Sequence, residues 1–284
     1  MAISSIKDIV DAEIEWRTMT YNFRKFTSQI TTSSVWFDMA MSSWNPWPKY
    51  WFDAAPLTAK IASQSLDGWF YHWPNISPRK KYLRTTTNTI TATWVPIQQI
   101  LCDYLLYYPS VAQDTTDVQV MDNTVKLSRY SDWKWVQILP VLVASASGGG
   151  QFFVTYTNSD GVPWRTSQIA QVYNNAVGSI AHCSADTSIS HWPFLWLQSW
   201  DTGVRSIDSV TMIWTDIGLT SFILVNPLTY SQIIDNTAPT ERDYFLDTWT
   251  LPQIQDDAYL SYIVCPRWTL NGVQQYTEMK IIWN

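Results

Sequence analysis

Short apolar runs recur along most of the chain, and their length and composition are typical of β-strands. Turn residues such as Asp122-Asn123 and Asn271-Gly272 separate them, and no helical patterns of about 10 to 15 residues alternate with the runs, as parallel βαβ units require. The pattern predicts a mainly β protein with an antiparallel β-sandwich or jelly-roll-like architecture. The runs are TNTITATWV from Thr87, ILCDYLLYY from Ile100, VQILPVLV from Val136, QFFVTYT from Gln151, SVTMIW from Ser209, LTSFILV from Leu219, YLSYIVC from Tyr259 and MKIIW from Met279.

The N-terminal segment has a different period. Between residues 3 and 29, Ile3, Ile6, Val10, Glu13, Ile14 and Trp16 recur mostly at helical spacing, and Ser4 or Ser5 is available as an N-cap, so we expect an amphipathic helix. Its apolar stripe needs a partner: either the helix packs on its own domain, or it is an arm that reaches a neighbouring subunit. We divide the chain into an N-terminal helical arm, residues 1–35, and a β-rich domain, residues 36–284, which forms one unit or two packed β subdomains.

Two stretches interrupt the strand pattern. From Thr31 to Pro78, repeated prolines prevent long regular elements and predict an extended, aromatic-rich connection. The triple glycine Gly148–Gly150 stands directly between two strand-like runs, which favours a hairpin turn over a hinge between domains. The acidic residues support the β assignment, because the chain has 20 Asp and only 4 Glu, and Asp favours turns whereas Glu favours helices.

The charge balance is acidic. With a net charge of -6, the chain lacks the general attraction to phosphate that nucleic-acid binding needs, so we expect no direct contact with nucleic acid. No stretch approaches about 18 uninterrupted apolar residues and the N-terminus lacks signal-peptide features, so we expect neither a membrane span nor standard secretion. Cys102, Cys183 and Cys265 lack the spacing of a zinc site or a disulfide framework and are expected to be buried small hydrophobes.

The nucleophiles and histidines form no recognisable catalytic pattern. The chain has no GxSxG motif, and His72, His182 and His191 have no neighbouring sequence that nominates a Ser or Cys partner. His182, Cys183 and His191 offer three metal ligands, but their spacing matches no structural zinc motif. We therefore predict no catalytic, cofactor-binding or metal-binding residues.

Carboxylates and basic residues give similarly weak signals. Asp256 and Asp257 are adjacent, so on a strand they point to opposite faces, whereas a glycosidase needs two carboxylates that face each other. Asp114 and Asp117 lie in a polar turn, and Gly148–Gly150 lacks the frame of a phosphate-binding loop. The one basic cluster of the sequence is either a solvated loop or a contact with an acidic neighbouring subunit. It consists of Arg79, Lys80, Lys81 and Arg84.

Glycine is scarce and tryptophan is abundant. The chain has 9 glycines and 18 tryptophans, where average usage of about 7% gives roughly 20 glycines. Several tryptophans stand in turn-like sequences where a residue with positive φ, normally glycine, is expected. Three interpretations are open: an aromatic binding surface, packing beneath long loops, or codons read as glycine, since the assignment of UGA varies between genetic codes. The turn-like positions are Trp44, Trp133, Trp135, Trp200 and Trp268.

Several longer segments carry a resemblance that extends from about Trp36 to the terminal KIIWN. They are KYWFDAAPLTAK from Lys49, LDGWFYHWPNISPRKKYLR from Leu66, LCDYLLYYP from Leu101, MDNTVKLSRYSDWKWVQ from Met121, FFVTYTNSDGVPWRTS from Phe152, DTGVRSIDSVTM from Asp201 and DDAYLSYIVCP from Asp256. Together they resemble a family of tailed-bacteriophage virion structural proteins, which are head-associated and mostly lack an assigned activity. Members of this family tend to have glycine where this chain has Trp73, Trp133, Trp135, Trp164, Trp200 and Trp268.

The resemblance implies a non-enzymatic structural component of a bacteriophage virion, such as a capsid decoration protein or a minor or major head protein, assembled in the host cytoplasm. We expect a homo-oligomer whose partners are other copies of itself and other virion proteins, with the arm and the segment from Trp44 to Pro78 as candidate contact regions. The alternative is a carbohydrate- or receptor-binding module of a phage fibre or tail, with Trp69 and Trp73 as candidate glycan contacts. A glycan-depolymerising enzyme is a third interpretation.

Overall fold

The structure, a computed structural model, describes residues 3–27, 30–72, 74–172, 176–183 and 192–284. The helices are α1 (Ile6–Ile14), the short 3-10 helix η1 (Met39–Met41) and α2 (Tyr244–Thr248). The strands are β1 (Thr18–Phe26), β2 (Phe37–Asp38), β3 (Ser43–Asn45), β4 (Lys60–Ile61), β5 (Lys81–Ile90), β6 (Ile97–Ala112), β7 (Gln119–Val120), β8 (Gln137–Ala144), β9 (Gln151–Asn158), β10 (Arg165–Thr166), β11 (Ala170–Gln171), β12 (His182–Cys183), β13 (Val204–Trp214), β14 (Leu219–Ile233), β15 (Thr240–Asp243), β16 (Gln253–Ile254), β17 (Tyr259–Pro266) and β18 (Gln274–Trp283).

The strands form three six-stranded sheets, each of which we name after a central strand. The β18 sheet has the order β15-β5-β18-β1-β3, with β16 also on β5; the β6 sheet has the order β2-β17-β6-β14-β8, with β4 also on β6; the β9 sheet has the order β12-β11-β9-β13-β7, with β10 also on β9. Every ladder between the strands named above is antiparallel. The predicted fold class, a mainly β antiparallel protein that begins with a helix, is confirmed.

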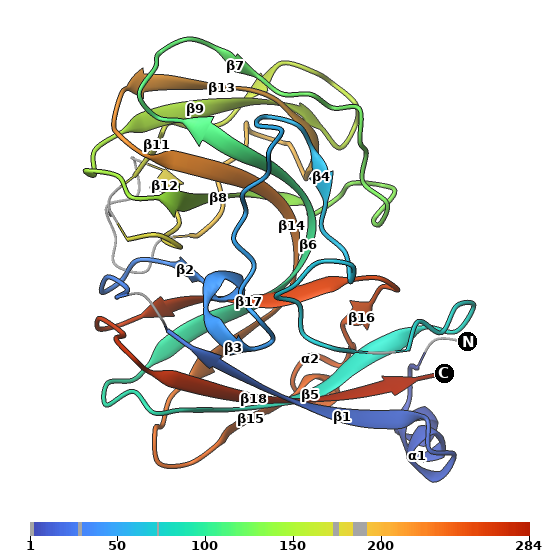
Figure 1. The fold of residues 1–284 in the computed structure, drawn as a ribbon. Helices are drawn as coiled ribbons and strands as arrows, with labels where there is room; N and C mark the ends of the chain where they lie inside the picture. The colour runs from blue at the N-terminus through green and yellow to red at the C-terminus, as the bar shows by residue number, and fades with distance from the viewer. Residues whose placement is uncertain (1–2, 28–29, 73, 173–175, 184–191) are drawn as a thin grey trace.

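β6 and β14 are long enough to belong to both halves of the molecule. They have 16 and 15 residues, and they pair from Ile97–Ile233 at one end to Ala112–Leu219 at the other. In Figure 1 the two strands curve from the β18 sheet at one end of the protein to the β9 sheet at the other. The β6 sheet therefore packs on a different partner sheet at each end.

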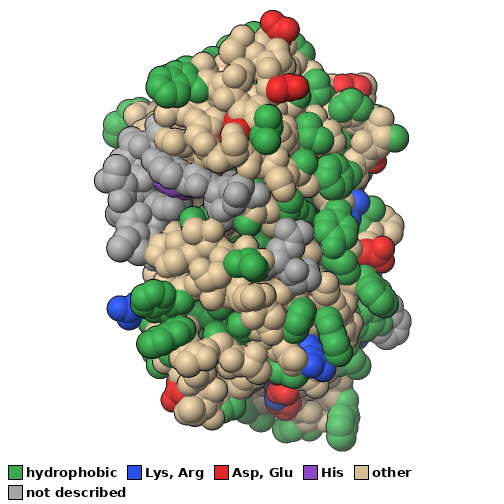
Figure 2. All heavy atoms as spheres, turned by 60° about the vertical axis from the view of Figure 1, so that its left-hand side comes forward, with side chains coloured by type: hydrophobic (Ala, Val, Ile, Leu, Met, Phe, Trp, Pro, Cys, Tyr) green, Lys and Arg blue, Asp and Glu red, His purple; other side chains and the backbone are tan. Residues whose placement is uncertain are grey.

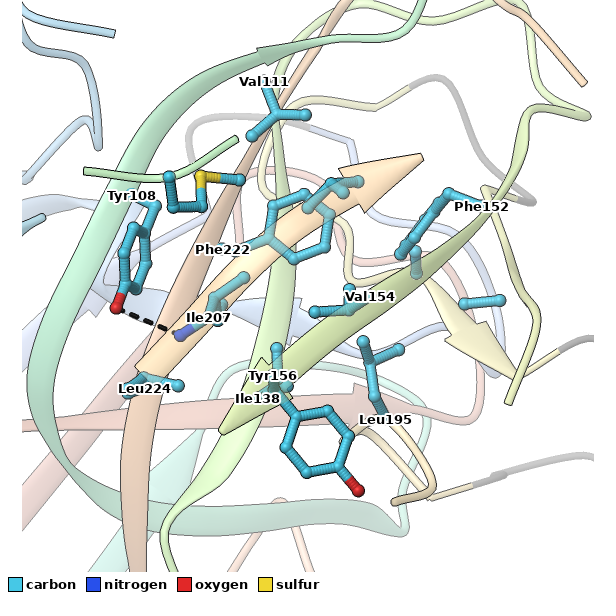
Figure 3. Packing of buried hydrophobic residues seen from close by; sticks show 14 of the residues in the cluster. Tyr108, Val111, Ile138, Phe152, Val154, Tyr156, Leu195, Ile207, Phe222 and Leu224 are labelled. Atoms are coloured by element: carbon cyan, nitrogen blue, oxygen red, sulfur yellow. Dashed lines mark hydrogen bonds between the residues drawn. The ribbon is translucent and has the colours of Figure 1, made fainter. Parts of the chain in front are cut away.

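The core between the β6 and β9 sheets is aromatic at its centre. Phe222 of β14 and Phe152 of β9 meet edge to face with ring centroids 5.2 Å apart, and each is 1% exposed. The Tyr108 hydroxyl of β6 accepts a hydrogen bond from the Ile207 N–H of β13 at 3.2 Å, which links the two sheets inside this core (Figure 3). Full burial of each such phenylalanine contributes about 1.5–3 kcal/mol, so this core holds the two sheets face to face.

Two further cores lie on the β6 sheet. Towards the β18 sheet, Phe23, Leu83 and Met279 pack against Leu101 and Leu260. Elsewhere the β6 sheet is covered by the proline-rich connection. The side chains brought there include Trp36, Met41, Trp51 and Ala62, which pack with Ile100, Tyr104 and Val225. The aromatic residues of the connection thus act partly as core.

Each of the eight predicted strand runs overlaps a strand, although β5 ends at Ile90, inside the run TNTITATWV. The predicted helix over residues 3–29 is wrong in its extent. Helix α1 begins after Ser5, whose hydroxyl accepts from the Asp8 N–H while the Asp8 carboxylate accepts from the Ser5 N–H. It ends at Ile14, and Thr18–Phe26 instead form a strand that pairs along its whole length with β18. A domain boundary at residue 35 stays a prediction.

The expectation of a hairpin turn at Gly148–Gly150 is also wrong. β8, before the glycines, pairs with β14 in the β6 sheet, whereas β9, after them, pairs with β13 in the β9 sheet. The glycines therefore connect two sheets. Their path is fixed by Asp216, whose carboxylate accepts from the N–H groups of Ser147 at 3.0 Å and Gly148 at 2.8 Å.

Trp200 illustrates a backbone feature that recurs in the fold. It is the third residue of a turn closed by the Asp201 N–H, which donates to the Gln198 carbonyl at 3.1 Å. Its φ is +75°, and its side chain is 97% exposed. A Cβ at such a φ costs roughly 1–2 kcal/mol of stability. Because the indole is exposed, no apolar burial offsets this cost.

We expect Trp200→Gly to raise the free energy of unfolding by about 1 kcal/mol, because glycine adopts this φ without strain. Trp200→Ala is the matched control: it also removes the indole but keeps the Cβ, so its stability should stay close to that of the original chain. Urea unfolding of the three proteins measures both effects. Equal stability of the Gly and Ala variants would show that the backbone is not strained.

Candidate functional site

A buried carboxylate, Asp38, organises the aromatic face of the β6 sheet. It is completely buried and accepts hydrogen bonds from the Trp51 indole N–H at 2.7 Å, the Tyr104 hydroxyl at 2.7 Å and the Ala40 N–H at 2.9 Å. Trp51 also stacks on Tyr104, with ring centroids 5.4 Å apart. Burial raises the pKa of Asp38 above its ordinary value, although the three donors oppose that shift. This network fastens the connection to the sheet.

A buried ion pair lies next to it on β6. Arg129 donates to both carboxylate oxygens of Asp103, at 3.0 and 2.9 Å, and also to the carbonyls of Ala62 and Tyr104. Asp103 accepts in addition from the Tyr259 N–H at 2.9 Å. The Asp103 carboxylate is fully buried and the Arg129 side chain is 6% exposed. A paired, enclosed group of this kind ties loops to a sheet and offers no access to a substrate.

His72 and Lys81 form a second enclosed group. The Lys81 ammonium donates to His72 Nδ1 at 3.0 Å, and His72 Nε2 bonds the Ala258 carbonyl at 2.8 Å, which fixes a neutral imidazole with its proton on Nε2. Burial and the Lys81 charge lower the pKa of His72 to about 3, and burial lowers the pKa of Lys81 to about 8. Both side chains are at most 1% exposed, so their role is structural.

The structure disperses the other candidate residues of the sequence. His182 is buried with its Nδ1 bonded to the Cys183 carbonyl at 3.0 Å, whereas His191 lies outside the described residues, as does Trp73. All three cysteines are buried, as expected. Among the described residues, no group of three or more His, Cys, Asp or Glu side chains has a geometry that would hold a metal ion.

The carboxylates that we weighed as acid–base candidates hold loops. Asp256 accepts from the N–H groups of Ile76 and Ser77, at 3.1 and 3.0 Å, and Asp257 accepts from the Gln64 N–H at 3.2 Å. Asp114 and Asp117 are exposed in the turn before β7.

The basic cluster does not act as a single patch. Arg79 and Lys80 are exposed, but Lys81 is buried against His72 and Arg84 forms an ion pair with Asp243. Two of its four charges are therefore neutralised or enclosed within the fold. The remaining pair is a small positive feature on an acidic protein.

The helical arm carries an exposed apolar face, which we call the α1 stripe: Ile6, Val10 and Ile14. These side chains are 62%, 47% and 70% exposed and follow one another at four-residue spacing. Another side of the helix is buried: Ala12 is completely buried, and Ile9 packs with Ile3 against Tyr82, Phe245 and Ile282. Figure 1 shows α1 at one end of the molecule, beyond β1 and near the C-terminus. The helix is thus apolar on two sides, and its own domain covers only one of them.

A groove beside two exposed tryptophans is the second candidate. Trp94 and Trp268, which are 60% and 51% exposed, have ring centroids 5.6 Å apart and line a groove of about 290 Å³ together with Thr91, Thr93 and Asn271. Exposed hydrophobic side chains stand singly and in small groups on the face in Figure 2, where charged ones are sparse. The earlier glycan candidate Trp69 differs, because it packs on the core and against the ring of Tyr71.

Sequence reasoning found the residues of the α1 stripe but neither the Asp38 network nor the Asp103–Arg129 ion pair. For the ion pair there was a signal, the charged residue Asp103 inside the apolar run ILCDYLLYY, since a buried charge requires a partner. No protein family, curated protein or solved structure matches the chain. Within the described part of the chain, no helix has the length and hydropathy needed to span a bilayer.

Lys25 makes the stability of the fold depend on pH. Its ammonium is buried and donates to the carbonyls of Ser42 at 3.0 Å and Pro46 at 2.9 Å; burial lowers its pKa to about 7, and the charge of Asp38 partly offsets this. Between about pH 7 and the ordinary lysine value near 10.5, the unfolded chain holds this proton and the folded chain does not. The contribution of Lys25 to stability therefore becomes more favourable as the pH rises through this window.

We expect Lys25→Met to lack this pH-dependent gain, so the stability difference between wild type and variant should shift in favour of the wild type from about pH 6.5 to about pH 9. Urea unfolding across this range measures it. Lys126→Met, at an exposed loop position, controls for the loss of one positive charge. Parallel pH profiles for wild type and Lys25→Met would contradict the assignment.

Proposed function

We propose that the chain is a non-enzymatic structural component of a bacteriophage virion, a capsid decoration protein or a minor or major head protein that acts through subunit packing. The observation that carries the proposal is the α1 stripe, an apolar helix face left open on a well-packed β protein. The resemblance noted for the sequence supports the class. The enclosure of Asp38, of the Asp103–Arg129 pair and of the His72–Lys81 pair supports a role in packing over one in catalysis.

The α1 stripe has the chemistry of a subunit contact. Burial of an isoleucine or valine side chain contributes about 1.5–3 kcal/mol, so covering three of them supplies binding energy at one short helix. The helix is held rigidly by its capping box and by the contacts of Ile9 and Ala12, so little conformational entropy is lost when a partner covers it. The partners proposed are another copy of the chain or a neighbouring virion protein, with nucleic acid and membrane not contacted. The assembled virion is the proposed location.

We expect the purified protein to self-associate, and Val10→Glu to weaken that association at least tenfold, because the variant places a charge in the centre of the α1 stripe. Val162→Glu is the matched control: it makes the same change at a side chain that is 48% exposed, against 47% for Val10, in the loop between β9 and β10. Sedimentation velocity measures association, and urea unfolding confirms that both variants stay folded. A wild-type chain that stays monomeric, or equal loss in both variants, would contradict the proposal.

A second candidate function, carbohydrate binding by a phage fibre or tail module, is favoured by the groove at Trp94 and Trp268. Aromatic faces stack on the apolar faces of sugar rings, and Thr91, Thr93 and Asn271 supply hydroxyl and amide groups beside them. The backbone at Trp94 and Trp268 does not have a positive φ, so these two residues are compatible with tryptophan.

For this candidate, an array of bacterial surface polysaccharides should yield a bound glycan whose affinity falls at least tenfold in Trp94→Ala. The matched control is Trp214→Ala, which removes another exposed indole, 65% accessible, from the end of β13. The candidate is excluded if no glycan binds or if the two variants lose affinity equally.

A further inference from the structure

Tryptophan is concentrated where the backbone calls for glycine. Of the 12 non-glycine residues with positive φ in the described chain, seven are tryptophan, with φ between +53° and +84°. Positive φ is uncommon outside glycine and is favoured there by Asn and Asp, whereas for a bulky residue it is an outlier. The seven positions are Trp16, Trp44, Trp133, Trp135, Trp164, Trp200 and Trp249.

A different one of these tryptophans lies just after the last residue of α2 and two residues after the last residue of α1. After α1, the Arg17 N–H donates to the Ala12 carbonyl at 2.8 Å and the Trp16 N–H donates to the Glu13 carbonyl at 3.2 Å. These two bonds define a Schellman motif with Trp16 at the left-handed position that glycine usually occupies. After α2, Trp249 has φ +57° and ψ +6°, and its N–H donates to the Phe245 carbonyl. Two independent helix ends thus show the same substitution of tryptophan for the expected glycine.

Turns between strands repeat the pattern. Trp164, in the loop between β9 and β10, has φ +62°. Trp200 has φ +75° and is the third residue of the turn closed by the hydrogen bond from the Asp201 N–H to the Gln198 carbonyl. Trp133 and Trp135 lie where the backbone approaches Gly203 closely, and the Trp135 N–H donates to the Thr202 carbonyl at 2.8 Å.

The side chains at these positions contribute little packing. Six of the seven are more than half exposed, from 51% at Trp44 to 97% at Trp200. By contrast, Trp36 and Trp51 have ordinary φ, are at most 2% exposed and pack in the core on the β6 sheet. The seven tryptophans with positive φ therefore differ from the buried pair Trp36 and Trp51: they occupy glycine geometry, and six of them expose more than half of the side chain.

We infer that the codons at these seven positions are read as glycine when the protein is made in its natural host. UGA is assigned differently in different genetic codes, so one codon can specify tryptophan in one code and glycine in another. Seven further glycines would raise the count from 9 to 16, towards the roughly 20 expected from average usage. The inference is independent of the proposed function.

This assignment changes which surfaces can bind a partner. With glycine at the seven positions, the exposed indoles at the ends of helices and at loop tips are absent, so they form no ligand-binding surface. The α1 stripe, which consists of Ile6, Val10 and Ile14, is unaffected, and so is the groove at Trp94 and Trp268.

The gene sequence gives the first test. We expect UGA at the seven codons and UGG at the codons for Trp36 and Trp51, which serve as the internal control. UGG at the seven positions would overturn the inference. Mass spectrometry of the protein isolated from its natural source then decides how UGA is read, because peptides that span Trp164 and Trp200 should carry the residue mass of glycine. Tryptophan masses in those peptides would overturn it.

A recombinant comparison tests the physical basis separately. The chain with glycine at all seven positions should have a higher unfolding midpoint than the chain with seven tryptophans, because strain is relieved at each site and no core is lost. Trp51→Gly is the control and should lower the midpoint, since that ring is buried against Tyr104. A lower midpoint for the seven-glycine chain would contradict the inference.

Discussion

The antiparallel ladder between β6 and β14 is the constraint on which the rest of the structure depends, because its two strands belong to both ends of the molecule. The β18 sheet covers one end and the β9 sheet covers the other, and the proline-rich connection packs on the same central sheet. The ladder also carries Asp103 and Tyr104, through which loops far apart in sequence are fastened to it. Its length explains why a core forms at each end of one continuous architecture.

Most of the strands could be predicted from the sequence, because the composition and period of a run such as ILCDYLLYY or QFFVTYT are typical of a β-strand. The choice of partner strand could not, since it is decided by long-range packing. β8 and β9 flank a triple glycine and look like a hairpin, yet each pairs in a different sheet. The helical arm was overestimated because apolar spacing continued past Ile14 into a strand that pairs with β18.

The candidate site was also predictable only in part, because local spacing is visible in the sequence whereas burial and long-range contacts are not. The spacing of Ile6, Val10 and Ile14 already indicated an apolar helix face, but burial was needed to separate this open face from the one covered by the domain. The network around Asp38 joins residues that are distant in sequence, so no local pattern could reveal it. The excess of tryptophan over glycine was visible in composition, while the backbone angles identified which tryptophans are involved.

The central claim, a structural role in the virion, is tested most directly by quantitative peptide mass spectrometry of purified phage particles that encode this chain. The measurement is the number of copies of the chain in each particle, expressed relative to the major capsid protein. If the chain is itself the major capsid protein, the measurement is its own copy number per particle. The account predicts a ratio commensurate with the head lattice, as packing between repeated subunits requires. Absence of the chain from purified particles would contradict it.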